Sequence, residues 1–143
     1  MSARERKNTS SAGYVLDTFT IMVLLRNEPG ADRVQELLRH ADKGVTRLYL
    51  SLINYGEVLF VVERRWGEVR LQRVVANMDS LPLDIRPVDR SLVQAAAHLK
   101  AWHHIPYADA FAAGLAQQLG VPVITGDPGF KELESEVAVE WLT

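Results

Sequence analysis

Four acidic residues lie at positions where a carboxylate is difficult to explain by folding alone. Asp17 and Asp127 directly follow short apolar runs that are typical of buried strands. Glu57 and Asp109 each lie in a segment whose neighbours are mostly apolar. A buried carboxylate without a partner is costly, so four such residues need a joint explanation.

A site for a hard divalent cation would explain all four residues together. Clustered carboxylates repel one another and need a counter-charge, and oxygen ligands without His or Cys suit Mg²⁺ or Mn²⁺. The chain contains no cysteine, which excludes thiolate ligands and a cysteine nucleophile. A cation of this kind can polarise a phosphodiester and lower the pKa of a bound water. The residue types therefore indicate metal-assisted phosphodiester hydrolysis.

Each carboxylate also has a simpler interpretation, and the sequence leaves these alternatives open. Asp17 could be the N-cap of a helix that begins near Phe19, and Asp127 could be an ordinary turn residue. Asp109 could favour a helix N-terminus through the helix dipole, although its neighbours form no polar stripe. Glu57 has no comparable explanation, because the solvent-facing end of its helix lies further on, at 63–65.

The bulk composition limits the classes of protein to consider. With 143 residues, 48% of them apolar and 24% charged, the chain has the size and composition of one globular domain. We expect a flexible tail at 1–12 and a single domain at 13–143. No apolar run is long enough for a membrane span and no export signal is visible, so the expected location is the cytoplasm. A net charge of −2 excludes a broad basic field for nucleic acid.

Short apolar runs alternate with longer amphipathic ones, which is typical of βαβ units. The pattern predicts strands at 14–16, 46–50, 83–88, 121–125 and 137–142. It predicts helices at 19–26, around 34–41, at 52–65, 68–78, 92–103 and 107–119, and a short turn of helix near 130–133. This order predicts a three-layer α/β/α domain with a mostly parallel central sheet. Ligands of such sheets collect beyond the carboxyl ends of the strands, where Asp17 and Asp127 are expected.

Several smaller features accompany this arrangement. Asp32, Ser51 and Asp89 are the predicted N-caps of three helices. Pro87 indicates that its strand ends there or runs along an edge of the sheet. Trp102 and Trp141 are expected in the core or an interface, and the adjacent pair His103-His104 is not expected to share a metal. The arginines near the break at Trp66 and Gly67 are candidate RNA contacts, although such residues are usually a solvated face: Arg64, Arg65, Arg70 and Arg73.

The ordered acidic residues resemble the pattern of the PIN domain, and most closely that of the VapC toxins of toxin–antitoxin pairs. The similar segments run from about Tyr14 to Trp141, and they are Val15-Leu16-Asp17-Thr18, Glu57 early in an apolar helix, Tyr107-Ala108-Asp109-Ala110, and Thr125-Gly126-Asp127-Pro128-Gly129-Phe130. Each motif is weak alone, whereas the four in this order are fairly specific.

The resemblance implies a Mg²⁺- or Mn²⁺-dependent endoribonuclease. It implies metal ligation by Asp17 and Asp109 first, with Glu57 and Asp127 completing the acidic pocket and Thr125 supporting it. It also implies an RNA substrate, a homodimer and an antitoxin whose tail binds the toxin, which would cover the excess of apolar residues at 21–25 and 59–61.

The chain departs from the family pattern at two positions. Phe19 replaces a frequent small hydroxyl residue, and Gly129 stands where some members carry a further acidic residue. These departures leave open a catalytically silent PIN-like module that binds RNA or protein. A receiver-type phosphoacceptor fold also places aspartates at strand ends, but its acidic pair after the first strand and its late lysine are not evident.

Overall fold

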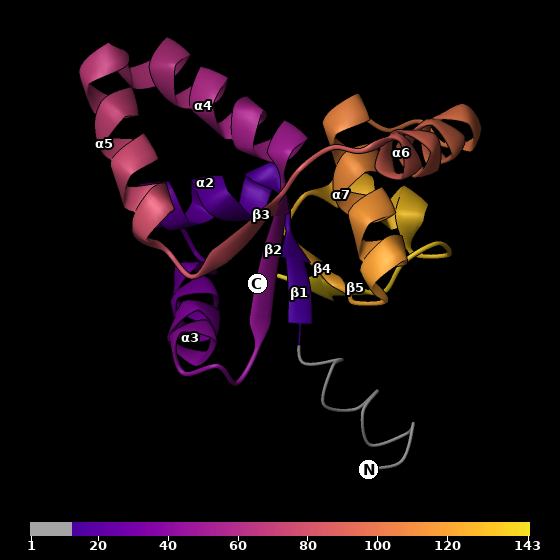
Figure 1. Ribbon diagram of the computed structural model, residues 1–143, viewed down its shortest axis with the longest axis horizontal. Helices are drawn as coiled ribbons and strands as arrows, with labels where there is room; N and C mark the ends of the chain where they lie inside the picture. Colours follow the sequence, from indigo (N-terminus) through magenta and orange to yellow (C-terminus); the bar gives the residue numbers. More distant parts are fainter. Residues whose placement is uncertain (1–12) are drawn as a thin grey trace.

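A single parallel sheet organises the computed structural model, which describes residues 13–143 (Figure 1). The predicted tail at 1–12 lies outside the described residues. The strands are β1 (Gly13–Leu16), β2 (Arg47–Ser51), β3 (Leu83–Arg86), β4 (Val123–Thr125) and β5 (Val139–Trp141), in the order β3-β2-β1-β4-β5. Every pairing among them is parallel. The chain builds outward from β1 in one direction and then in the other, so the strand order reverses between β1 and β4.

Helices cover both faces of this sheet (Figure 1). They are α2 (Thr18–Arg26), α3 (Ala31–Asp42), α4 (Leu52–Trp66), α5 (Glu68–Ser80), α6 (Arg90–Trp102), α7 (Tyr107–Leu119) and the 3₁₀ helix η1 (Pro128–Leu133). Helices α2 to α5 pack on one face, and α6, α7 and η1 pack on the other. The predicted three-layer α/β/α architecture is therefore confirmed.

Strand alternation divides the apolar residues between two cores. Val15 lies in register with Tyr49 and contributes to the core under α6 and α7. The next residue, Leu16, lies in register with Leu50 and Ile124 and contributes to the core under α2 to α5. Successive side chains of a strand point to opposite faces, so these short strands are buried on both sides.

Two of the three predicted helix caps are present. The Ser51 Oγ accepts a hydrogen bond from the Asn54 amide at 3.1 Å, and the Asp89 Oδ1 accepts one from the Leu92 amide at 2.8 Å. The prediction that Asp32 caps α3 was wrong. This helix starts at Ala31, two residues earlier than an Asp32 cap requires, after Gly30, whose φ of 103° gives a left-handed entry that leaves Asp32 inside the first turn.

Two strands start later than the sequence predicts, for local reasons, and a third ends at a proline. Strand β5 starts at Val139 because the Val137 amide instead donates to the Leu133 carbonyl at 3.0 Å. The Val121 amide likewise bonds the end of α7, so β4 starts later than expected. Strand β3 is an edge strand that ends just before Pro87, as expected of a proline there. Trp102 is 76% exposed at the end of α6, which excludes it from the core and leaves an interface as the prediction.

No helix in residues 13–143 is long and apolar enough to cross a membrane. The longest one, α4, has 15 residues and forms a hairpin with α5 that projects from one side of the sheet (Figure 1).

A bidentate ion pair connects α3 to the edge strand β5. The Arg33 Nε donates to one Glu140 oxygen at 2.9 Å, and its Nη2 donates to the other at 3.0 Å. Arg33 also pairs with Glu36 and lies 5.9 Å from the ring centre of Tyr14. Bidentate geometry makes this pair stronger than most half-exposed ion pairs.

We predict that Arg33→Met lowers the free energy of unfolding by about 1 kcal/mol, because the apolar stem remains while both hydrogen bonds to Glu140 are lost. Urea denaturation followed by circular dichroism measures the change. Arg39→Met, at an exposed position of the same helix, is the matched control and should change stability less. Equal changes in the two variants would show that the Arg33–Glu140 pair does not stabilise the fold.

Candidate active site

The four carboxylates are carried by four elements that meet at the carboxyl edge of the sheet. Asp17 ends β1 and is the N-cap of α2, and Asp127 follows β4, the neighbouring strand. Asp109 lies in the first turn of α7, and Glu57 lies in the second turn of α4. Since parallel strands end at one edge and the following helices begin there, this topology gathers residues that are far apart in sequence.

Asp17 is buried and held by two hydrogen-bond donors. Its Oδ1 accepts from the Thr20 amide at 2.9 Å, and its Oδ2 accepts from the Thr125 hydroxyl at 2.5 Å. The Thr125 Oγ also accepts from the Asp127 amide at 3.0 Å, so one hydroxyl connects the two strand-end aspartates. Burial nevertheless raises the pKa of Asp17 to about 6, because the hydrogen bonds only partly offset the loss of water.

Asp109 is the carboxylate whose environment is least satisfied. It is 7% exposed, and its Oδ2 is buried without a hydrogen-bond partner. Burial, followed by the charges of Asp127, Asp17 and Glu57, raises its pKa to about 7. The other three acidic residues therefore lie within electrostatic range of the Asp109 carboxyl group.

The simpler interpretations of two residues hold alongside this grouping. Asp17 does cap α2, and the Asp127 Oδ1 does accept from the Gly129 amide at 2.9 Å, as in an ordinary turn. The turn bond uses one oxygen of Asp127, whereas both oxygens of Asp17 accept a hydrogen bond, one from the Thr20 amide and one from the Thr125 hydroxyl. The capping geometry therefore fixes the direction of each carboxylate rather than replacing a role in the pocket.

Asn54 is a buried residue of this region that the sequence analysis did not single out as part of the site. Its Nδ2 donates to the Thr18 hydroxyl at 3.1 Å and to the Ala108 carbonyl at 3.3 Å, and its Oδ1 accepts from the Ser51 hydroxyl at 2.6 Å. One amide thus connects the starts of α2, α4 and α7, the helices that carry three of the acidic residues. The available signal was a polar residue within an apolar helix, three positions after the Ser51 cap.

Thr20 connects α2 to the neighbouring strand in a similar way. It is fully buried, and its hydroxyl donates to the Ile124 carbonyl at 2.7 Å. Its amide is the one that Asp17 caps. Phe19 stands where the family pattern frequently has a small hydroxyl residue. In this chain, Thr20 and Thr125 supply hydroxyl groups around Asp17.

The donor set suits a hard cation that keeps most of its own water. All four acidic side chains offer oxygen, and the unpartnered Asp109 Oδ2 is a buried acceptor without a donor. Within residues 13–143, no group of three or more acidic or histidine side chains is placed so that it could hold a metal ion by itself. Mg²⁺ commonly uses only one or two protein carboxylates together with water and substrate phosphate, so an open acidic pocket fits it better than a closed cage would.

Gly129 lies close to this pocket. A Cβ atom at this position would be 3.3 Å from the Asp127 Oδ1 and 3.7 Å from the Asp109 Oδ2. A longer side chain at this position would therefore lie beside two of the carboxylates. In this chain, glycine leaves that space to water, ions or substrate.

The candidate RNA-contact arginines lie on the projecting hairpin of α4 and α5. Arg64, Arg65, Arg70 and Arg73 are all exposed. The guanidinium groups of Arg65 and Arg70 lie 5.8 and 5.1 Å from the ring centre of Trp66. Arg64 is about 10 Å further along α4 than Glu57, at 1.5 Å per residue. These residues form a separate basic surface rather than a wall of the acidic pocket.

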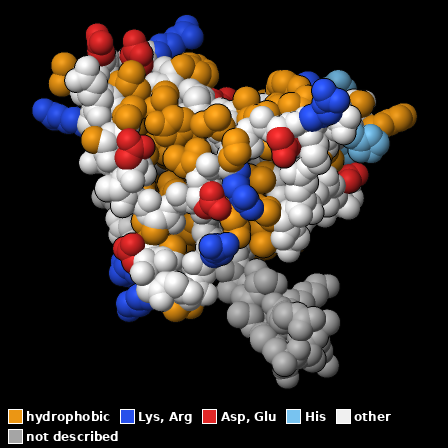
Figure 2. All heavy atoms as spheres, in the orientation of Figure 1, with side chains coloured by type: hydrophobic (Ala, Val, Ile, Leu, Met, Phe, Trp, Pro, Cys, Tyr) orange, Lys and Arg blue, Asp and Glu red, His pale blue; other side chains and the backbone are white. Residues whose placement is uncertain are grey.

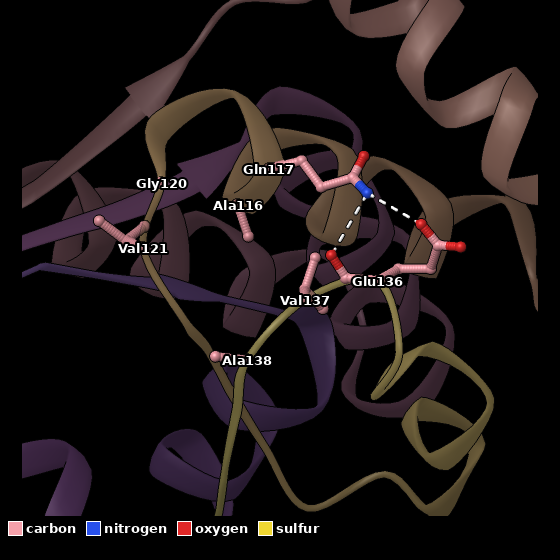
Figure 3. Close-up of a pocket in the computed structure, with 7 residues that line it drawn as sticks. All are labelled: Ala116, Gln117, Gly120, Val121, Glu136, Val137 and Ala138. Carbon is pink, nitrogen blue, oxygen red and sulfur yellow. Dashed lines mark hydrogen bonds between the residues drawn. The ribbon is translucent and has the colours of Figure 1, made fainter.

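A hollow at the other edge of the sheet is distinct from the acidic pocket (Figure 3). It lies between the end of α7 and the segment before β5, and Gln117 donates hydrogen bonds across it to Glu136. Gly120 and Val121 precede β4, whereas Asp127 follows that strand. The hollow therefore opens at the amino ends of the strands, away from the four carboxylates.

A parallel α/β domain with acidic residues at its topological switch point is the class that this fold and site define. The family model of the PIN domain matches residues 14–136. The chain therefore belongs to the PIN domain family, and the resemblance seen in the sequence is confirmed. No curated protein sequence matches the chain.

Solved structures with a similar fold include proteins of toxin–antitoxin complexes. The DNA-bound VapBC complex of Salmonella typhimurium is 23% identical, covers 90% of this chain and 97% of that chain, and has a TM-score of 0.71. VapBC2 of Rickettsia felis, bound to a promoter DNA fragment, is 17% identical, with coverages of 92% and 99% and a TM-score of 0.74. VapC20 of Mycobacterium tuberculosis, a Sarcin-Ricin loop cleaving toxin, is 18% identical, with coverages of 87% and 96% and a TM-score of 0.65.

The raised pKa values predict a definite pH dependence of stability without metal. A carboxyl group whose folded-state pKa is raised stabilises the fold when protonated, and this contribution is lost as pH rises through the folded-state pKa, about 6 for Asp17 and about 7 for Asp109. We predict that Asp109→Asn is more stable than the unsubstituted protein at pH 8 by about 2 to 4 kcal/mol, and that the difference shrinks towards pH 5.

Urea denaturation in EDTA at pH 5, 6, 7 and 8 measures this difference. Asp79→Asn, an exposed aspartate at the end of α5, is the control and should follow the unsubstituted protein at every pH. A difference between Asp109→Asn and the unsubstituted protein that stays constant over this range would contradict the predicted burial of charge at Asp109.

Proposed function

We propose that this protein is a metal-dependent endoribonuclease that hydrolyses RNA phosphodiester bonds and acts as the toxin of a toxin–antitoxin pair. The observation that carries the proposal is the position of the buried Asp109 carboxyl group, whose pKa is raised first by burial and then by the charges of Asp127, Asp17 and Glu57. Membership of the PIN domain family supports nuclease chemistry. The similarity to VapC20, a Sarcin-Ricin loop cleaving toxin, supports RNA as the substrate.

The proposed roles follow from the contacts of each residue. Asp17 and Asp109 would hold Mg²⁺ or Mn²⁺, with Glu57 and Asp127 completing the negative pocket. When bound, such a cation supplies charge neutralisation for the phosphate and a bound water of lowered pKa. Thr125 connects the two residues, because its hydroxyl donates to the Asp17 carboxylate and accepts from the Asp127 amide. Asn54 positions α4 and α7, and thereby Glu57 and Asp109, without facing the substrate.

The proposed partners are an antitoxin protein and a second copy of the chain. Several structures with this fold are VapBC toxin–antitoxin complexes, some of them bound to DNA. Helix α4 leaves large apolar side chains uncovered, namely Leu52, Ile53 and Phe60, at 45%, 36% and 55% exposure. Figure 2 shows hydrophobic side chains gathered over the region of α2, α4 and α5. This apolar surface suits a protein partner better than water.

Two further parts of the proposal concern the substrate and the compartment. The exposed arginines of the α4–α5 hairpin are the proposed RNA contacts, because an acidic pocket alone repels a phosphate backbone. The proposed location is the cytoplasm, where RNA is available.

We predict that Asp17→Asn lowers the rate of RNA cleavage at least 100-fold while the fold is retained, because the neutral amide removes a metal ligand but can still accept the Thr20 hydrogen bond. Incubation of the purified chain with total RNA, in Mg²⁺, Mn²⁺ or EDTA, measures cleavage, and circular dichroism measures the fold. Asp32→Asn, an exposed aspartate outside the pocket, should cleave at the normal rate. Normal cleavage by Asp17→Asn, or by the unsubstituted protein in EDTA, would rule out the proposed mechanism.

Metal binding also predicts a change in stability that does not depend on catalysis. A cation that binds only the folded state stabilises it by mass action, and here it also relieves the repulsion among the carboxylates. We expect Mg²⁺ to raise the melting temperature of the unsubstituted protein and of Asp32→Asn by several degrees, but to have little effect on Asp109→Asn. Differential scanning calorimetry in Mg²⁺ and in EDTA tests this, and equal shifts in all three proteins would contradict ligation by Asp109.

A further inference from the structure

An aromatic side chain lies exposed beside the acidic pocket. Phe19 is in the first turn of α2, two residues after Asp17, and is 41% exposed. Its ring packs against Gly126, the residue before Asp127. A Cβ atom at Gly126 would lie only 2.6 Å from the Phe19 Cε1, so any side chain there would displace the ring. The backbone of Gly126 thus supports an aromatic ring next to a carboxylate of the pocket.

Phe19 forms one wall of a hollow of about 290 Å³. Val23, Pro29 and Leu142 give it further apolar walls, and Gly126 connects it to the acidic pocket. Its volume is at the lower end of the range for small-ligand sites, about 300 to 1,000 Å³. The hollow therefore suits a flat, largely apolar group attached to a chain that passes through the acidic pocket.

Glu28 is the charged side chain at the edge of this hollow. Its carboxylate is 47% exposed and forms an ion pair with Arg26, with 3.8 Å between the nearest nitrogen and oxygen, which is too long for a hydrogen bond and leaves its acceptor sites open. A carboxylate can only accept hydrogen bonds. The group that best matches it therefore presents two neighbouring donors on one edge and no acceptor between them.

Among the RNA bases, guanine has this pattern at its N1–H and N2–H₂ groups. Adenine and cytosine each place an acceptor beside a single amino group, and uracil places its one donor between two carbonyl oxygens. A stacked base whose Watson–Crick edge is read by side chains is the usual means of recognising unpaired RNA. An exposed ring supplies the stacking surface for such a base.

We propose that Phe19 and Glu28 form a guanine-binding subsite that holds a base of the RNA next to the bond to be cleaved. This inference rests on the proposed ribonuclease function and names a substrate feature that the same site would select. Phe19 stacks on the base, Gly126 lets the ring approach Asp127, and Glu28 accepts hydrogen bonds from the base edge. Phe19, a departure from the family pattern, is then a specificity residue of this chain.

Nucleotide binding without metal tests the subsite independently of catalysis. GMP, IMP, AMP and CMP are titrated in EDTA against the full chain labelled with ¹⁵N, and the amide shifts of Phe19, Glu28 and Gly126 are followed. We expect GMP to bind most tightly, and IMP, which lacks the exocyclic amino group, to bind several-fold more weakly. Phe19→Leu should weaken GMP binding about tenfold, as expected for the loss of one stacked base.

Matched variants separate recognition from general effects on the fold. Glu28→Gln should reduce the difference between GMP and IMP, whereas Glu68→Gln, an exposed glutamate on α5, should not. Trp102→Leu removes an exposed aromatic ring outside the hollow and should leave GMP binding unchanged. Equal binding of the four nucleotides, or GMP shifts that Phe19→Leu leaves unchanged, would overturn the proposal. Shifts at these residues that arise only on adding a protein partner would also overturn it.

Cleavage-site mapping distinguishes failure of the subsite from failure of the proposed function. With a randomised RNA library, the unsubstituted protein should cut with guanine enriched at one fixed position beside the cleaved bond, and Glu28→Gln should lose that enrichment. Cleavage without any base preference would overturn the subsite while leaving the ribonuclease function intact. GMP binding by a chain that cuts no RNA would uphold the base-binding site and contradict the ribonuclease function.

Discussion

Repulsion among buried carboxylates is the constraint on which the functional edge of this domain depends. Asp17 and Asp109 are almost entirely removed from water, and this burial raises the pKa of Asp17 to about 6 and that of Asp109 to about 7. Stability alone does not explain these two carboxylates, because a neutral side chain of the same size would avoid the cost of burying a charge. The destabilisation is instead consistent with a pocket that is completed by a cation, so that stability and activity would respond to the same ion.

The acidic side chains repel one another, and the residues that hold them in place do not neutralise their charge. Thr125, Thr20 and Asn54 serve this purpose, since each is fully buried, and their side chains connect the ends of β1 and β4 with the starts of α2, α4 and α7. Hydroxyl and amide groups can donate to a carboxylate or a carbonyl without supplying the positive charge that a lysine would. None of these three supporting side chains therefore competes with a cation for the carboxylates.

The sequence was sufficient to predict the elements and the edge at which the acidic residues meet. Alternating strands and a proline at the end of β3 leave few possible sheets, and the strand ends then place Asp17 and Asp127 together. Asn54 was not predicted as part of the site because two of its three partners, Thr18 and Ala108, come from distant segments, and a polar residue after the Ser51 cap does not by itself indicate those contacts. The sequence could not decide between core and interface for Trp102, since helical spacing cannot show where the covering layer ends.

Phe19 and Gly126 illustrate how a departure from a family pattern acquires meaning only in three dimensions. In the sequence, Phe19 replaces an expected hydroxyl residue, so it casts doubt on a hydrogen bond that would hold the Asp17 carboxylate. In the structure, Thr125 and Thr20 already hold Asp17, so the position is free to carry a different group, and its ring lies on a glycine of the neighbouring strand end. The shared carboxylates and the divergent ring belong to one surface. Chemistry that many members of a family have in common can thus be combined with a contact that belongs to this chain.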